Sequence, residues 1–353
     1  MMIFETTQGI RHRKNRPTGN LPDINLLDEM NENIEEYVKS LSKNPDIIGI
    51  TLTGGLSRGY GDTLSEIDLN IYLKETALAD WNKGKGPLPQ GDHLGTKYHM
   101  DVSFLSLEIE KKTDWSLLKK WDVSYTKIIY DPTGAIEQLL DSKDIFTAEE
   151  KHRLAISNYL DCVYFGDIVV RQWIQRADQL VANQMISKGI PSLCNLLFLV
   201  NDEYPPFEKW LVNYSYSLPW KPENWRKRLE TITLIQELDL SEVERRSTEF
   251  MMLYREVWGK VVGEEYRDTG LLELDALETL EYVIRMQPTV EEFTNRFDIK
   301  QLGYENLYKL ADIKTIDGEE RIIFNHERFK EEQAKGFPSF LDWNKEMLGH
   351  IKL

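Results

Sequence analysis

The sequence has few cysteines, no long apolar run and no excess of positive charge. Cys162 and Cys194 are its only cysteines, and they stand far apart. A disulfide framework and a zinc site both require close-spaced cysteines, so neither is expected. No stretch approaches the roughly 18 consecutive apolar residues of a membrane span, so no membrane association is expected. The first residues are polar and basic and lack the apolar core of a secretory signal, which predicts a cytoplasmic protein.

Negative charge dominates, with 43 Lys and Arg against 59 Asp and Glu and a net charge of −16. A protein that follows the phosphates of a long nucleic acid concentrates Lys and Arg. The balance therefore disfavours long nucleic acid as a partner. It suits a cationic small molecule better.

The chain has 353 residues, of which 41% are hydrophobic. That length exceeds one ordinary core and predicts more than one domain. We expect a loose arm over residues 1–22, a mixed-sheet domain over 23–145 and a helical domain over 146–353.

Apolar periodicity supports this division. In the first domain it predicts a helix over 23–42, strands over 47–53, 66–73, 98–105 and 127–130, and a loop over 83–95. Beyond 148 it predicts helices over 148–188, 192–199, 222–238, 241–262 and 271–286. Asp317-Gly318 predicts a hairpin between 311–313 and 321–324.

The most informative stretch runs from Thr51 to Leu73, T-L-T-G-G-L-S-R-G-Y-G-D-T-L-S-E-I-D-L-N-I-Y-L. A predicted strand leads to Gly54-Gly55, where the backbone N–H groups can approach a ligand closely. Ser57 adds a hydroxyl donor and Arg58 a forked cation. The stretch therefore predicts a binding turn for phosphate.

Acidic residues follow on the next predicted strand. Glu66 and Asp68 are two positions apart, so their carboxylates lie on the same face. Two adjacent carboxylates repel each other, and a divalent cation removes that cost. Asp101, on the strand predicted after the Gly/Pro-rich loop, can complete the cluster. We expect a Mg²⁺ site at Glu66, Asp68 and Asp101, which suits phosphoryl transfer.

This arrangement resembles the nucleotidyltransferase superfamily, and within it the antibiotic nucleotidyltransferases that modify aminoglycosides and lincosamides. Their Gly-Ser turn, Arg-Gly pair and Ser-Asp-x-Asp strand correspond to Gly54–Gly59 and Ser65–Asp68. The segment 128–134, I-I-Y-D-P-T-G, resembles the end of the family's first domain. The resemblance covers residues 24–140 and implies an α+β fold, in which a nucleotidyltransferase mixed β-sheet domain precedes an all-α helical domain.

The resemblance also implies residue roles. Gly54, Gly55, Ser57, Arg58 and Ser65 would bind the nucleotide, and Arg58 would hold phosphate. Two positions depart from the family: Gly55 replaces the usual Ser, and Glu66 replaces the usual Asp.

The helical domain is expected to supply a second cation for the triphosphate. Lys209 is the candidate, because Pro205-Pro206 would fix the start of its helix. Asp161 and Asp167 could serve as general base, although ordinary helix-surface acids are the simpler interpretation. The tryptophans, Trp121 and Trp210 among them, are expected in the core.

The expected activity is Mg²⁺-dependent transfer of a nucleoside monophosphate from an NTP, ATP first, to a hydroxyl of a small molecule such as an aminoglycoside-like antibiotic. Two alternatives stay open. The acceptor could be a protein side chain, as in AMP-ylating or toxin-type enzymes. The departures at Gly55 and Glu66 could instead mark a non-catalytic nucleotide-binding module.

Overall fold

A computed structural model of the chain describes residues 4–19, 21, 25–95, 97–264, 267, 271–297, 309–340, 345 and 348–349, with side chains left out over 271–278. It divides into two compact units. One comprises Glu5–Val257, and the other comprises Trp258–Leu353 with Met1–Phe4. The division predicted at residue 145 therefore does not separate compact units, because the sheet and the following helices pack into one.

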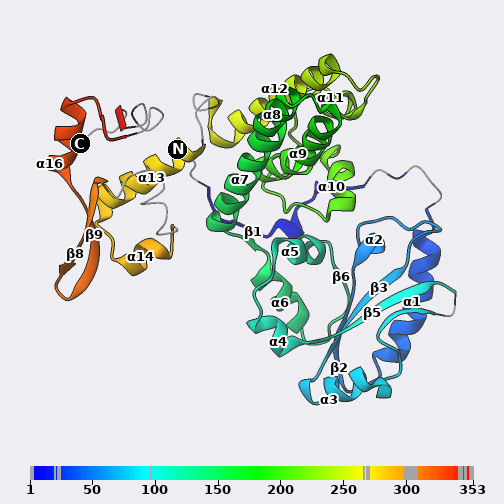
Figure 1. Cartoon of the computed structure of the whole chain (residues 1–353). Helices are drawn as coiled ribbons and strands as arrows, with labels where there is room; N and C mark the ends of the chain where they lie inside the picture. The colour runs from blue at the N-terminus through cyan, green and yellow to red at the C-terminus, as the bar shows by residue number, and fades with distance from the viewer. Residues whose placement is uncertain are drawn as a thin grey trace. The chain divides into compact units, whose positions relative to one another are not determined.

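The larger unit is built on a five-stranded mixed sheet of order β4-β5-β3-β2-β6 (Figure 1). β3 and β5 are parallel, and the other neighbouring pairs are antiparallel. The strands are β2 Ile47–Leu52, β3 Ile67–Leu73, β4 Gly91–Leu94, β5 His99–Ser106 and β6 Lys127–Tyr130. Four of these match the predicted strands. β4 lies in the segment 83–95 that was predicted to be a loop, and that part of the prediction was wrong.

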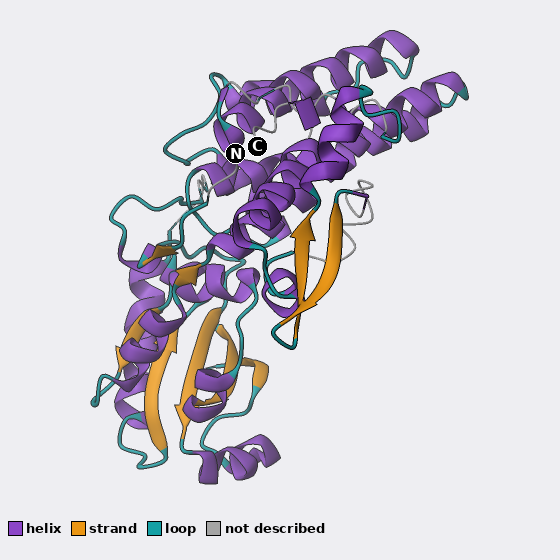
Figure 2. Cartoon of the chain, turned by 90° about the vertical axis from the view of Figure 1, so that its left-hand side faces the viewer, coloured by secondary structure: helices purple, strands orange, loops and turns teal. Residues whose placement is uncertain are grey.

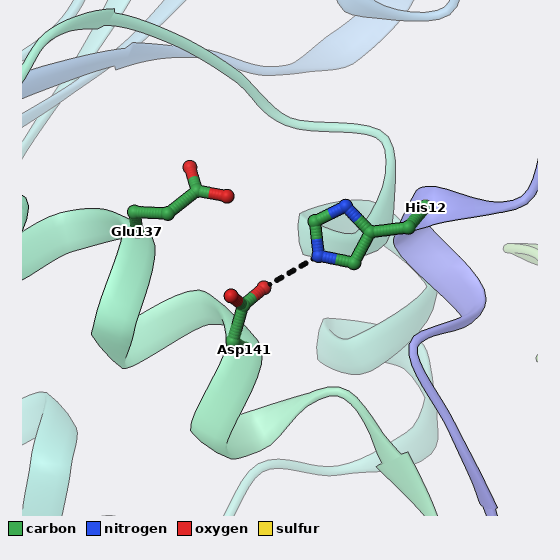
Figure 3. A group of neighbouring side chains, drawn as sticks. All are labelled: His12, Glu137 and Asp141. Atoms are coloured by element: carbon green, nitrogen blue, oxygen red, sulfur yellow. Dashed lines mark hydrogen bonds and ion pairs between the residues drawn. The ribbon is translucent and has the colours of Figure 1, made fainter.

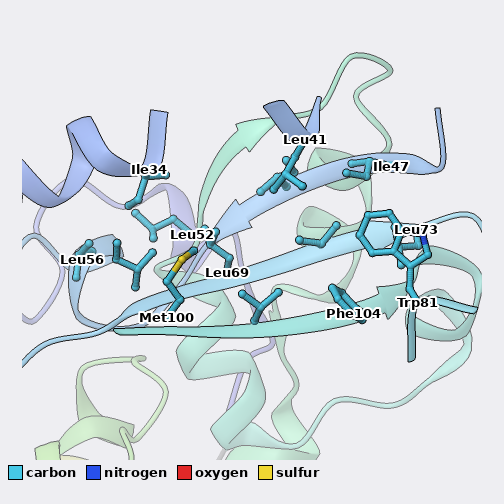
Figure 4. Close-up of a cluster of buried hydrophobic side chains, with 14 of the residues drawn as sticks. Ile34, Leu41, Ile47, Leu52, Leu56, Leu69, Leu73, Trp81, Met100 and Phe104 are labelled. Atoms are coloured by element: carbon cyan, nitrogen blue, oxygen red, sulfur yellow. The ribbon is translucent and has the colours of Figure 1, made fainter. Parts of the chain in front are cut away.

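Alternation along β3 explains the sheet's core. Ile67, Leu69 and Ile71 are buried on one face, where α1 (Leu27–Leu41) packs with Met30 and Ile34 (Figure 4). Burying each such side chain contributes roughly 1.5–3 kcal/mol. α1 confirms the predicted helix, although residues 23–24 of that prediction lie outside the described residues.

Short helices connect the strands, and some of them cover the second face. Tyr72 points to that face and packs in a cluster with Ile136, Leu139 and Leu140 of α6. The connecting helices are α2 Gly54–Ser57, α3 Glu75–Asp80, η2 Trp81–Lys85, α4 Leu107–Lys112, α5 Leu117–Ser124 and α6 Ala135–Lys143. The α+β fold class is thus confirmed, with a mixed sheet followed by a helical part.

The helical part begins at Thr147, whose hydroxyl and Glu150 form a reciprocal cap. Its helices are α7 Ala148–Val163, η3 Tyr164–Ile168, α8 Val169–Gln175, α9 Gln179–Val200, α10 Glu208–Ser215, α11 Trp225–Thr233 and α12 Leu240–Val262. Figure 2 shows helix (purple) as the main content of this region.

One predicted helix break is wrong in position. We expected a break between residues 188 and 192, where Gly189 and Pro191 stand, but α9 continues through Pro191. Gly189 lies against Phe250, where a Cβ would come within 2.7 Å of the ring. The break falls earlier, at Ala177 with φ 59°, and Asp178 caps α9 by accepting from the Val181 N–H.

Residues 5–18 of the N-terminal segment are packed rather than loose, which corrects the arm predicted over 1–22 for this described part. β1 (Thr7–Gln8) pairs with β7 (Ile145–Phe146), and Ile10, in η1 (Ile10–His12), is fully buried. Further along, Arg16 is 7% exposed and pairs with Glu203, which is 4% exposed. We call residues 5–18 the strap, because they tie the sheet to the helical part.

The smaller unit has its own core and is not all-α. It contains α13 Leu271–Met286, α14 Val290–Thr294, β8 Ala311–Ile316, β9 Glu319–Phe324 and α16 His326–Ala334. The hairpin predicted at Asp317-Gly318 is confirmed by the β8–β9 pairing. Phe293, Ile322, Phe324 and Phe329 are buried in its core.

Candidate functional site

The turn after β2 presses directly against Asp68. Gly54 has a φ of +64°, and a Cβ there would collide with the Asp68 carboxylate. The neighbouring Thr53 N–H donates to the Asp68 carbonyl oxygen at 2.9 Å. Glycine is required at position 54 both by its backbone conformation and by this close approach.

Asp68 and Asp101 are brought together by strand register. They are direct partners in the parallel β3–β5 pairing, so both side chains leave the same face of strands about 4.8 Å apart. Glu66 immediately precedes β3 and is exposed. Asp92 on β4 is the register partner of Asp101.

The carboxyl group of Asp68 has a pKa far above its usual value. Burial, followed by the charges of Glu66, Asp122 and Asp101, raises the pKa of Asp68 from 3.8 to about 7. A nearby cation would relieve this cost. The environment therefore favours a positively charged partner beside Asp68.

The three predicted ligands are not drawn into one tight group. Among the described residues, only His12, Glu137 and Asp141 offer three ligand atoms within 4.8 Å of one another (Figure 3). That group is exposed, and Arg11 already donates to Glu137 at 2.9 Å and to Asp141 at 2.6 Å. A guanidinium thus occupies the place a metal would need.

Arg58 lies at the site with its charge already paired. Its guanidinium forms an ion pair with Asp122 and stacks on the Trp121 ring at 4.3 Å, with only 6% of the side chain exposed. Tyr60 lies beside it, and burial raises the pKa of that phenol. Phosphate binding by Arg58 stays a prediction, and Asp122 is its partner in this structure.

The predicted serine donors are used within the turn. The Ser57 hydroxyl donates to the Gly54 carbonyl at 2.9 Å and is buried. The Ser65 hydroxyl donates to Asp62 at 2.9 Å. Ser57 therefore stabilises the turn, and its role in binding a nucleotide stays a prediction.

The departure at Gly55 has a local cause. A Cβ at Gly55 would lie 2.8 Å from the Tyr60 ring, so a serine would force that ring to move. Tyr60 in turn packs on Trp210 of α10 at 5.3 Å between ring centroids. Gly55 accommodates an aromatic contact with the helical part.

A cavity of about 780 Å³ collects most of the predicted site residues. Gly54, Gly55, Arg58, Ser65, Glu66, Asp68 and Lys209 line it, and Ser57 and Asp101 do not. Lys209 is exposed, its ammonium lies 5.8 Å from the Trp210 ring centre, and it forms no ion pair with any residue the structure describes.

Several wall residues of this cavity are not predicted from the sequence. Asp122, Tyr60 and Phe207 line it, and so do Trp121 and Trp210, which we expected in the core. Trp121 is 2% exposed, so it serves as both core and wall. No sequence spacing predicts Asp122 as a site residue, because it reaches the cavity only when α5 packs beside the turn at Gly54-Gly55.

The two candidate general bases lie elsewhere. Asp161 lines a different cavity, and Asp167 forms an ion pair with Arg171 on the helix surface. Neither lines the cavity that contains Asp68.

Comparisons with known proteins find one family match to part of the chain and a weak similarity to a solved structure. A family described as a domain of unknown function (DUF4037) matches residues 121–211, a segment that includes Asp122 and Lys209. No curated protein matches. A solved structure, a nucleotidyltransferase-like protein from Exiguobacterium sibiricum 255-15, is similar with a TM-score of 0.42 and 13% identity, over 84% of this chain and 99% of that chain. These values establish neither family nor activity. No helix in the described part of the chain is long and apolar enough to cross a bilayer.

Proposed function

We propose that this protein is a Mg²⁺-dependent nucleotidyltransferase that moves a nucleoside monophosphate from an NTP to a hydroxyl of a small molecule. The observation that carries the proposal is the placement of Asp68. It lies between a glycine turn, which presses on its carboxylate, and Asp101, its register partner on β5.

Although the three acids are not drawn into one group in this structure, carboxylate oxygens are the ligand type that a hard divalent cation takes. Glu66, Asp68 and Asp101 would hold it, since Mg²⁺ prefers oxygen ligands and shares its shell with phosphates. Burial and nearby like charges raise the pKa of Asp68 to about 7, because they make its ionised form unfavourable. A bound cation would stabilise that ionised form. When bound, Mg²⁺ neutralises phosphate charge in the transferring nucleotide.

The chain's own groups would orient the nucleotide. The Gly54-Gly55 backbone forms one wall of the cavity, and Lys209 of α10 supplies a cation on the same cavity. An acceptor hydroxyl would attack the α-phosphorus in line and lose its proton to water, the bond to the bridging oxygen would break, and pyrophosphate would leave. Trp121, Trp210 and Phe207 add apolar surface to the same cavity.

The cavity suits a small acceptor. Its volume of about 780 Å³ lies within the range of small-molecule sites. Asp62, Glu66 and Asp68 line it, which favours a cationic acceptor such as an aminoglycoside. A protein side chain is the alternative acceptor. The non-catalytic alternative rests on Gly55 and Glu66. The contact with the Tyr60 ring gives a structural reason for glycine at position 55 and so weakens that alternative.

The decisive assay is pyrophosphate release with each of four NTPs against a panel of aminoglycosides and lincosamides. Asp68→Asn should lower turnover at least about a thousandfold, because the charge that neutralises a metal is lost. Asp80→Asn, an exposed acid paired with Lys85, is the matched control and should keep full activity.

Near-normal turnover of Asp68→Asn in saturating Mg²⁺ would refute the site. Metal-dependent NTP binding without pyrophosphate release for any acceptor would instead identify a nucleotide-binding module. Circular dichroism of both variants shows whether the fold is retained.

A further inference from the structure

A second cavity lies where the sheet meets the helical part of the same unit. Its volume is about 950 Å³, and α5, α6, α7 and α9 all contribute to its wall. It shares only Ser116 with the cavity of Asp68. Pockets of this size at the junction of structural layers are typical places for small ligands.

Uncharged polar side chains form a connected wall on α7 and α9. The Asn195 amide donates to the Asn158 side-chain oxygen at 2.9 Å, and the Asn158 amide donates to the Leu154 carbonyl at 2.7 Å. Asn158 and Ser192 are 5% and 6% exposed. Buried amides and hydroxyls that are held in place in this way present fixed donors and acceptors to hydroxyl groups.

Two of the three cations that line this cavity form ion pairs, and the third, Lys143, donates to the Thr113 carbonyl at 2.7 Å. Lys120 donates to Glu150 at 2.6 Å, and Arg153 pairs with Glu149 at 2.6 Å. An anion such as a phosphate would therefore meet little free positive charge here. This separates the second cavity from the expected nucleotide site.

One half-buried carboxylate is left without a cation. Asp161 accepts a hydrogen bond from the Ser192 hydroxyl at 3.1 Å, and no ion pair joins it to any residue within the described ranges. It lies beside the ordered amide wall. A ligand ammonium would supply the missing counter-charge.

From these observations we propose that the second cavity binds a hydroxyl-rich small molecule that carries an ammonium group, an amino sugar in the simplest case. Asp161 binds the ammonium, and Ser192 orients its carboxylate. Asn158 and Asn195 bind the ligand hydroxyls. This site does not depend on the proposed transferase activity.

The test uses three probes and the full chain without nucleotide. Glucosamine carries both features, glucose carries only hydroxyls, and spermidine carries only ammonium groups. Calorimetry or saturation-transfer NMR should show glucosamine bound at least about tenfold more tightly than glucose or spermidine, since a charge-assisted contact adds to the hydroxyl contacts.

Two variants locate the site. Asp161→Asn should weaken glucosamine about tenfold and leave glucose unchanged, whereas Asn195→Leu should weaken both sugars. The matched control is Asp167→Asn, which removes an acid six residues further along, outside the cavity. Thermal unfolding shows that each variant is folded.

The proposal is overturned if glucosamine binds no better than glucose, if spermidine binds as tightly, or if Asp161→Asn behaves like Asp167→Asn. Loss of transferase activity in Asp68→Asn with unchanged glucosamine binding would support two independent sites. If the protein releases no pyrophosphate, only the transferase proposal fails, and the sugar-binding results still decide whether the second cavity is a binding site.

Discussion

At the scale of single residues, Asp68 links pH to stability. Because its pKa is raised to about 7 in the folded protein, the fold holds a proton that the unfolded chain has released above its usual 3.8. The free energy of unfolding should therefore be highest below about pH 4 as far as this group is concerned, and fall as the pH rises through 7. The shift corresponds to roughly 4 kcal/mol at most.

Urea denaturation from pH 4 to pH 8, compared between the wild type and Asp68→Asn, isolates this contribution. The difference between the two curves should grow in favour of the variant as the pH rises. Adding Mg²⁺ at pH 8 should stabilise the wild type and leave the variant nearly unchanged. A difference that does not vary with pH would contradict the assigned environment of Asp68.

Two neighbouring glycines show which features of this site could be predicted from the sequence and which could not. Gly54 was identifiable because a strand, a glycine pair and an acid-x-acid strand follow each other in a recognisable order. The reason for glycine at position 55 could not be identified from the sequence. It depends on Tyr60, which packs against Trp210 of α10, about 150 positions away. The ion pair between Arg58 and Asp122 has the same origin in tertiary structure.

At the scale of elements, α10 carries Lys209, which lines the first cavity and is predicted to bind phosphate. Lys209→Ala should weaken binding of a non-hydrolysable NTP analogue with Mg²⁺ by roughly tenfold, because an ammonium contact to phosphate is lost. The effect should shrink in 0.5 M salt, since Lys209 is exposed.

Lys112→Ala, at the exposed end of α4, is the matched control. Calorimetric titration measures both. Equal affinities for Lys209→Ala and the control would show that α10 takes no part in nucleotide binding.

Elements with strong local patterns were predictable, and elements that depend on their surroundings were not. β3 and β5 show apolar alternation, and β2 and β6 are short apolar runs that end at clear turns. β4 is a short edge strand whose only strand partner is β5, and its Gly/Pro-rich surroundings gave no period. Pro191 would normally end a helix, but α9 extends through it, with eleven of its residues buried.

At the scale of the whole molecule, the strap joins segments that are distant in sequence. Arg16 donates to Glu203 at 2.9 Å and to the Ser124 carbonyl at 2.9 Å, and it stacks on Tyr125 at 3.8 Å. Arg16→Ala would leave Glu203 buried with only Arg13 as a weaker partner at 3.3 Å. Removing one member of such a pair should cost about 3–5 kcal/mol.

Urea denaturation measures this loss against Arg153→Ala, whose ion pair with Glu149 is exposed and should contribute less than about 1 kcal/mol. Equal losses in the two variants would mean that the strap does not stabilise the larger unit. The sequence did not predict this segment, because its few apolar residues show no period and its partners lie far along the chain.

The strap also constrains how the protein is made. Arg16 leaves the ribosome 187 residues before Glu203 does, an interval of roughly 10–40 s at typical rates of synthesis. Thr18 must wait still longer for Ser217. The strap is therefore made well before the residues that hold it in place, and until they follow, its arginines are open to other acidic groups.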